Sequence, residues 1–160
     1  MVTRFDFGSG MKNVLAFVAA VVVAYIVAVI CYTQLNLANL VEMGLTVDFG
    51  DRVSAALHDL GGMAPLYLPI IAVAFLLGFG VAALIIRFVP QLRSLGYVLA
   101  GFVAIYTVDW ALGNLIAAGT HPLAVTRTTV GLLSQCVAGA IGGYVFVRIL
   151  GPRDGDAAGA

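Results

Sequence analysis

The chain has 160 residues, of which 62% are hydrophobic and only 10% are charged. Soluble domains carry about 25% charged and about 45–50% apolar residues, so the composition excludes a soluble globular domain and indicates an integral membrane protein in contact with the lipid bilayer. The formal net charge is zero and no basic residues interleave with the aromatic ones, which argues against a nucleic-acid partner.

Four apolar segments follow one another along the chain, at residues 14–32, 64–86, 95–117 and 128–150. Each has close to the roughly 20 residues that a helix needs to cross a hydrocarbon core about 30 Å thick. Lipid offers the backbone no hydrogen-bond partners, so each segment must be helical. We predict an all-α integral membrane protein. Its four transmembrane helices form an up-down bundle within one domain, residues 1–150, followed by a disordered cytoplasmic tail, residues 151–160.

The first apolar segment follows the basic residues Arg4 and Lys12, as the apolar part of a secretory signal peptide does. Its apolar run is longer than the about 7–15 residues of a signal sequence, and we expect it to stay in the protein as a membrane anchor.

Small residues recur at four-residue spacing in the first and the fourth apolar segments. They are Ala16, Ala20, Ala24 and Ala28 in the first, and Gly139 and Gly143 in the fourth. Such faces let helix backbones approach closely in lipid, so they predict packing between helices of this chain. Alternatively, the alanine face binds a second copy or a partner membrane subunit, which would make the protein a homo-oligomer or part of a complex.

Residues 33–63 form the longest segment between the predicted spans and are expected to lie outside the membrane. After Asp48, apolar residues fall at positions i, i+3, i+4 and i+7, which is typical of one face of a helix: Val53, Ala56, Leu57 and Leu60. Asp48 and Asp51 suit the beginning of such a helix, and Gly61-Gly62 suits its end. We predict a short amphipathic helix on the outer membrane surface.

Basic residues are concentrated on one side of the predicted membrane. On that side lie Arg4, Lys12, Arg87, Arg93, Arg148 and Arg153, and on the other Arg52 and Arg127. Because short cytoplasmic loops are enriched in Lys and Arg, both termini are predicted to be cytoplasmic. The abundance of alanine, valine and glycine fits a bacterial protein, so we place it in the bacterial inner membrane as a multi-pass protein.

Asp109 lies in the third apolar segment, where an ionised carboxylate costs about 2.5–3.5 kcal/mol at the helix centre. It must therefore be paired or hold a proton. An antiparallel hairpin of the third and fourth segments places Gln135 level with it, which predicts a direct hydrogen bond between the two side chains. With Tyr106 and Asn114 they form a candidate intramembrane polar site. This site is either an interhelical clamp or a binding site for a proton, cation or polar solute.

A second polar group, His58, Asp59 and His121, is predicted on the outer surface, where His58 and Asp59 could act as an acid/base pair. No nucleophile and no metal-ligand spacing accompanies these residues. Cys31 and Cys136 also lack the spacing of a metal site, so we predict no metal and no cofactor.

These features favour a non-enzymatic small inner-membrane protein that acts as a subunit, assembly factor or scaffold of a membrane complex. The first alternative is a small transporter or channel with a proton, cation or solute site at Asp109. The second is a membrane enzyme acting on a lipid or quinone at the outer surface.

Overall fold

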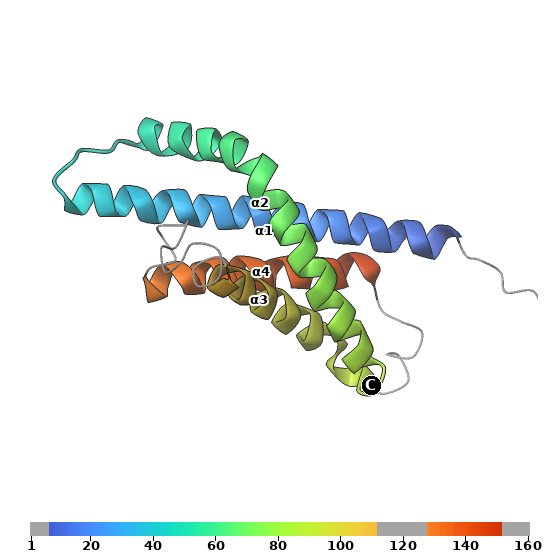
Figure 1. Cartoon of the computed structure of the whole chain (residues 1–160). Helices are drawn as coiled ribbons and strands as arrows, with labels where there is room; N and C mark the ends of the chain where they lie inside the picture. The colour runs from blue at the N-terminus through green and yellow to red at the C-terminus, as the bar shows by residue number, and fades with distance from the viewer. Residues whose placement is uncertain (1–6, 112–127, 152–160) are drawn as a thin grey trace, which may run out of the picture.

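The computed structural model describes residues 7–111 and 128–151, and every regular element within these ranges is helical (Figure 1). The elements are α1 (Phe7–Glu42), α2 (Phe49–Ile86), the short 3-10 helix η1 (Pro90–Leu92), α3 (Arg93–Ala111) and α4 (Thr129–Leu150). The expected all-α class is confirmed for this part of the chain, and four helical segments are long and apolar enough to cross a membrane.

The first two helices are much longer than the apolar segments that predicted them. α1 has 36 residues and α2 has 38, so at about 1.5 Å per residue each is roughly 55 Å long, against about 30 Å for a hydrocarbon core. The segment 33–63 is therefore largely helical: it comprises the end of α1, a turn that contains Gly44 with a positive φ of 90°, and the start of α2.

The predicted amphipathic helix begins where the sequence indicates but is not a separate element. Asp48 is the N-cap of α2, and its carboxylate accepts a hydrogen bond from the backbone amide of Asp51 at 2.8 Å. In return, the carboxylate of Asp51 accepts a hydrogen bond from the backbone amide of Asp48. The predicted end at Gly61-Gly62 is wrong, because the helix continues to Ile86. Glycine favours a helix end where the backbone needs a positive φ, and among the described residues only Gly44 and Gly151 have one.

We expect Asp48→Ala to lower the free energy of unfolding by about 1 kcal/mol, the usual cost of losing a side-chain N-cap. Amide hydrogen exchange measures this loss, and we expect it to be faster in the first turn of α2 in the variant. Ser54→Ala, further along the same exposed stretch, is the matched control. Unchanged exchange in the first turn of the Asp48 variant would show that the cap contributes nothing.

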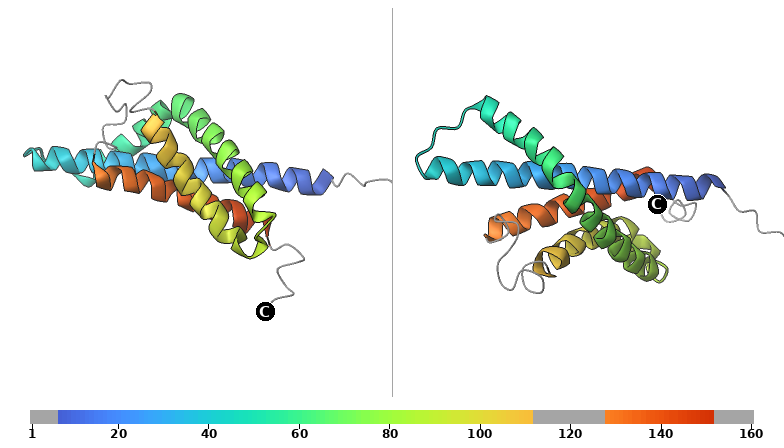
Figure 2. Two further views of the ribbon diagram at one scale, coloured as in Figure 1. Left: turned by 60° about the horizontal axis from the view of Figure 1, so that its bottom comes forward. Right: turned by 45° about the horizontal axis from the view of Figure 1, so that its top comes forward.

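α2 changes direction part-way along its length (Figures 1 and 2). Its first part runs beside the end of α1, and its second part crosses α1 and continues along α3. Two prolines, Pro65 and Pro69, lie inside the helix, and each removes one backbone hydrogen bond and crowds the carbonyl four residues earlier. They are the physical cause of a bend in this region.

α4 lies between α1 and α3 and packs on both (Figure 2). Against α3 the two backbones almost touch: a side chain on Gly139 would overlap the carbonyl oxygen of Gly101, and one on Gly143 would overlap that of Tyr97. Against α1, Gly142 faces the backbone of Ala20. The glycines of α4 therefore serve contacts within this chain.

The alanine face of α1 is also used within the chain. Ala16, Ala20, Ala24 and Ala28 are all buried, with at most 1% of each residue exposed. A face already covered by α4 and its neighbours is not available to a second copy or a partner subunit. The alternative that this face mediates assembly is therefore not supported by the packing.

An aromatic cluster fixes the second part of α2 against the other three helices. Phe79 lies at its centre, with ring centroids 6.4 Å from Phe17 on α1, 5.6 Å from Tyr97 on α3 and 4.6 Å from Phe146 on α4. The pairs with Phe17 and Tyr97 are edge-on and the pair with Phe146 is stacked, and aromatic pairs add to the stabilisation from burial. The cluster holds the second part of α2 against the other three helices.

Candidate functional site

Asp109 is the most unusual polar residue in the described part of the chain. It lies near the end of α3, is only 3% exposed, and neither carboxylate oxygen has a hydrogen-bond partner among the described residues. Native proteins satisfy nearly all buried polar groups, so an orphaned carboxyl requires an explanation. The surroundings of Asp109 therefore decide what this carboxyl can do.

The packing of α3 explains why Asp109 points inward. Tyr97, Gly101, Ile105 and Asp109 recur every four residues, and all are buried. This spacing puts them on one stripe of the helix. Gly101 and Ile105 contact Gly139 of α4, so the stripe faces α4 and carries Asp109 into the protein interior with it.

The predicted hydrogen bond between Asp109 and Gln135 is absent. Gln135 is 1% exposed, and its amide is engaged elsewhere: Oε1 accepts from the hydroxyl of Tyr67 at 3.2 Å, and Nε2 donates to the carbonyl oxygen of Ala28 at 3.1 Å. The prediction considered only the hairpin of α3 and α4. In the folded chain α1 and α2 also reach Gln135, and each makes one hydrogen bond with its amide.

Tyr67 is the site residue that the sequence analysis missed. It is buried in α2, and its hydroxyl donates a hydrogen bond to Oε1 of Gln135. The available signal was a tyrosine between two prolines inside an apolar segment, because a buried tyrosine hydroxyl usually needs a partner.

The other predicted members of the intramembrane site are not brought to Asp109. Tyr106 is 46% exposed, so it lies on the outer surface of the helices although it is one turn from Asp109. Asn114 lies outside the described residues. Ile105 contacts Gly139, and Asp109 and Gln135 each lie one turn further along the facing sides of α3 and α4. The site that the structure supports therefore comprises Asp109 of α3 and Gln135 of α4, with Tyr67 of α2 and the carbonyl of Ala28 hydrogen-bonded to Gln135.

The predicted outer-surface group does not form a site in the described residues. His58 is exposed, whereas the adjacent Asp59 accepts a hydrogen bond from the hydroxyl of Thr33 on α1 at 2.7 Å. His121 lies outside the described residues. Within the described ranges no three His, Cys, Asp or Glu side chains are grouped so that they could hold a metal ion. Asp59 thus connects α2 to α1, and an acid/base role for the pair has no geometric support.

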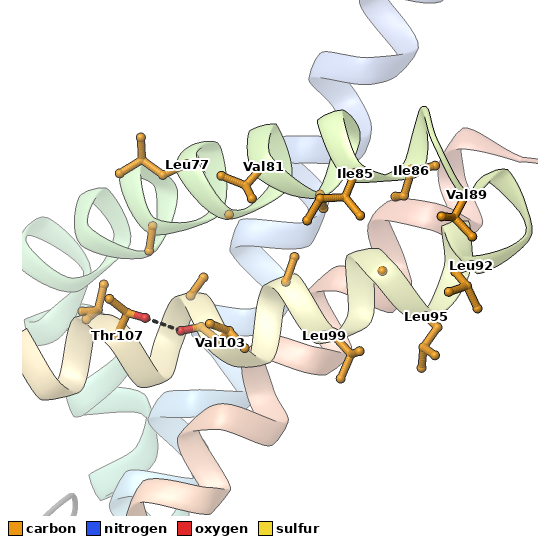
Figure 3. A pocket seen from close by; sticks show the side chains of 17 residues that line it. Leu77, Val81, Ile85, Ile86, Val89, Leu92, Leu95, Leu99, Val103 and Thr107 are labelled. Carbon is orange, nitrogen blue, oxygen red and sulfur yellow. Dashed lines mark hydrogen bonds between the residues drawn. The ribbon is translucent and has the colours of Figure 1, made fainter.

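An apolar groove of about 560 Å³ runs between α2 and α3 (Figure 3). Leu77, Val81 and Ile85 line it from α2, and Leu99 and Val103 from α3. Thr107 is its polar lining residue, and the hydroxyl of Thr107 donates to the carbonyl of Val103 at 2.8 Å within the same helix. The groove therefore offers hydrocarbon contacts, and Asp109 is not part of its lining.

Comparison with protein-family models, curated proteins and solved structures finds no match to this chain.

Proposed function

We propose that this is a small multi-pass membrane protein that binds a proton or another small cation at Asp109, as a transporter or channel would. The observation that carries the proposal is a carboxyl group that is 3% exposed and has no hydrogen-bond partner among the described residues. An acid kept in a membrane helix for packing alone would be expected to bond to a neighbouring helix. Asp109 makes no such bond to any residue that the structure describes, so its energetic cost points to a functional role.

Burial favours a small ion over a protein partner as the group that binds to Asp109. A basic side chain of another subunit would have to enter the interior of the packed helices to reach a carboxyl with this exposure. A proton or small cation needs only a narrow and transient route. The small-residue faces that favoured a scaffold or subunit are also occupied within the chain, at Ala20 and Gly139 for example.

A role as a membrane-complex subunit stays as the second candidate, and the groove between α2 and α3 favours it. An apolar groove of about 560 Å³ on the surface of the helices could accept an apolar segment of another membrane component. The enzyme alternative is the weakest of the three because His58 and Asp59 lie in different surroundings.

The proposed setting is the bacterial inner membrane, with an up-down helix bundle and cytoplasmic termini. Arg93, at the start of α3, donates to the carbonyl oxygen of Gly151 after α4 at 2.7 Å. The end of α2, the start of α3 and the end of α4 thus lie together, and they carry Arg87, Arg93 and Arg148. This grouping supports the assignment of that end to the cytoplasm.

The test is ion flux through the purified full-length protein in lipid vesicles. We expect a membrane potential to drive uptake of protons, Na⁺ or K⁺ faster than in empty vesicles, and Asp109→Asn, which keeps shape but removes the charge, to reduce uptake to the empty-vesicle level. Glu42→Gln, at the exposed end of α1, is the matched control and should transport like the unsubstituted protein. Equal flux in the Asp109 variant, or no flux of any of the three ions, would overturn the proposal.

A further inference from the structure

We propose that the groove between α2 and α3 binds an acyl chain of an anionic phospholipid, and that Arg87, at the end of the groove, binds the phosphate of the same lipid. This site is separate from Asp109 and does not depend on the proposed ion binding. Three features carry the inference: the shape of the groove, its length compared with one leaflet of the bilayer, and the positive charge where it ends.

Small residues form the floor of the groove and large ones form its two walls (Figure 3). The helices approach closely at Gly78, where a β-carbon would lie 3.2 Å from the carbonyl oxygen of Ala100. Beside this contact stand four wall residues, each more than half exposed: Leu77 and Val81 of α2, and Leu99 and Val103 of α3. The result is a long channel whose surface is almost entirely hydrocarbon.

The size of the groove suits a single hydrocarbon chain and not a helix. Its lining follows α2 from Ala74 to Ile86, which at 1.5 Å per residue is about 18 Å, close to the roughly 15 Å of hydrocarbon in one leaflet. A helix about 10 Å across would fill roughly 1,400 Å³ over this length, against a groove of about 560 Å³. A helix could therefore enter only in part, whereas an acyl chain can lie in the groove along its whole length.

The groove ends next to an uncompensated positive charge. Ile86 and Val89 line this end, and Arg87 lies between them in the chain. Arg87 is exposed and makes no hydrogen bond or ion pair with any residue that the structure describes. Residues 60–108 contain no Asp or Glu that could neutralise it.

A phospholipid phosphate is the anion that a bilayer presents where a membrane helix ends. The guanidinium of arginine matches phosphate because it can donate two parallel hydrogen bonds. Arg93 is nearby in the chain but has a different task, since it donates to the carbonyl oxygen of Gly151 and so connects the start of α3 to the end of α4. Arg87 is thus the residue that selects an anionic head group.

The test titrates the purified full-length protein in detergent with phosphatidylglycerol or with phosphatidylcholine of the same chain length, and measures bound lipid by native mass spectrometry. One Lys or Arg near a membrane surface attracts anionic lipid by an amount equivalent to about fivefold in affinity, so we expect about fivefold tighter binding of phosphatidylglycerol. Arg87→Gln should bind both lipids equally, and Arg87→Lys should keep the preference. Lys12→Gln, which removes an exposed charge from α1, is the matched control and should also keep it.

The seat of the acyl chain is tested by filling the groove. Val103→Trp places a large side chain in it and should weaken the binding of both lipids, while the preference for phosphatidylglycerol remains. Val137→Trp is the matched control, because Val137 is exposed to a similar degree on α4 and does not line the groove. It should bind both lipids like the unsubstituted protein.

Equal affinity of the unsubstituted protein for the two lipids would overturn the proposal, and so would a preference that survives in Arg87→Gln. Unchanged lipid binding by Val103→Trp would show that the acyl chain does not lie in the groove. A cross-link from Leu99→Cys to another protein in native membranes would show that a protein segment occupies the groove in place of the lipid.

Discussion

Replacing Gly143 by valine is expected to prevent the four helices from packing. The β-carbon would overlap the backbone of Tyr97 in α3, and neither backbone can move away without separating α3 from α4 along their length. Overpacking of flexible side chains costs about 1–3 kcal/mol, and a clash with backbone should exceed this range because no rotamer change relieves it. The measurement is the yield and thermal stability of the detergent-solubilised monomer.

Gly80→Val is the control for this experiment. Gly80 lies in α2, is exposed, and has nothing within 4 Å of the position that its β-carbon would occupy. Glycine is a poor helix former, so this substitution should leave stability unchanged or raise it slightly. If the Gly143 and Gly80 variants melt at the same temperature, the close approach of α3 and α4 is incorrect.

Ala20→Leu is expected to unfold the single chain and not merely to dissociate an oligomer. Ala20 is completely buried, and its carbonyl lies next to Gly142 of α4, so there is no space for three additional carbon atoms. We expect the free energy of unfolding to fall by at least about 3 kcal/mol, which is the upper end of the usual cost of overpacking a core. Thermal stability and native molecular mass, measured on the same sample, distinguish internal packing from assembly.

Ala83→Leu is the matched substitution, because Ala83 is exposed on α2 and should tolerate a larger apolar side chain in lipid. A result in which Ala20→Leu retains the stability of the unsubstituted chain but halves its native mass would support the alternative that the alanine face binds a second copy.

The helical class and the spanning segments could be predicted because they depend on composition and length alone. Lipid forces any long apolar segment to satisfy its own backbone, so no tertiary information was needed. The beginning of α2 was also predictable, since the capping box of Asp48 and Asp51 is a local arrangement. The continuation of α2 through Gly61-Gly62 was not, because glycine permits a helix end without requiring one.

The polar site was only half predictable for a different reason. Asp109 and Gln135 stand out in apolar segments, but which residues they contact depends on how α1 and α2 pack against them. Tyr67 approaches Gln135 from a position 68 residues earlier in the chain, and Ala28 from 107 residues earlier. Tyr106 was assigned to the site by helical spacing alone, and spacing does not reveal that the contact stripe on α3 is narrow.

The first part of α2 is hydrogen-bonded to α1 at three places: Tyr25 donates to the carbonyl of Leu60, Thr33 to Asp59, and Arg52 to Gln34. Among the residues that the structure describes, the part of α2 beyond the prolines makes no side-chain hydrogen bond to α1, and the aromatic cluster around Phe79 holds it there instead. This part of α2 forms one wall of the groove between α2 and α3. The width of the groove thus depends on how the aromatic rings around Phe79 pack between the helices, and not on hydrogen bonds from this part of α2 to α1.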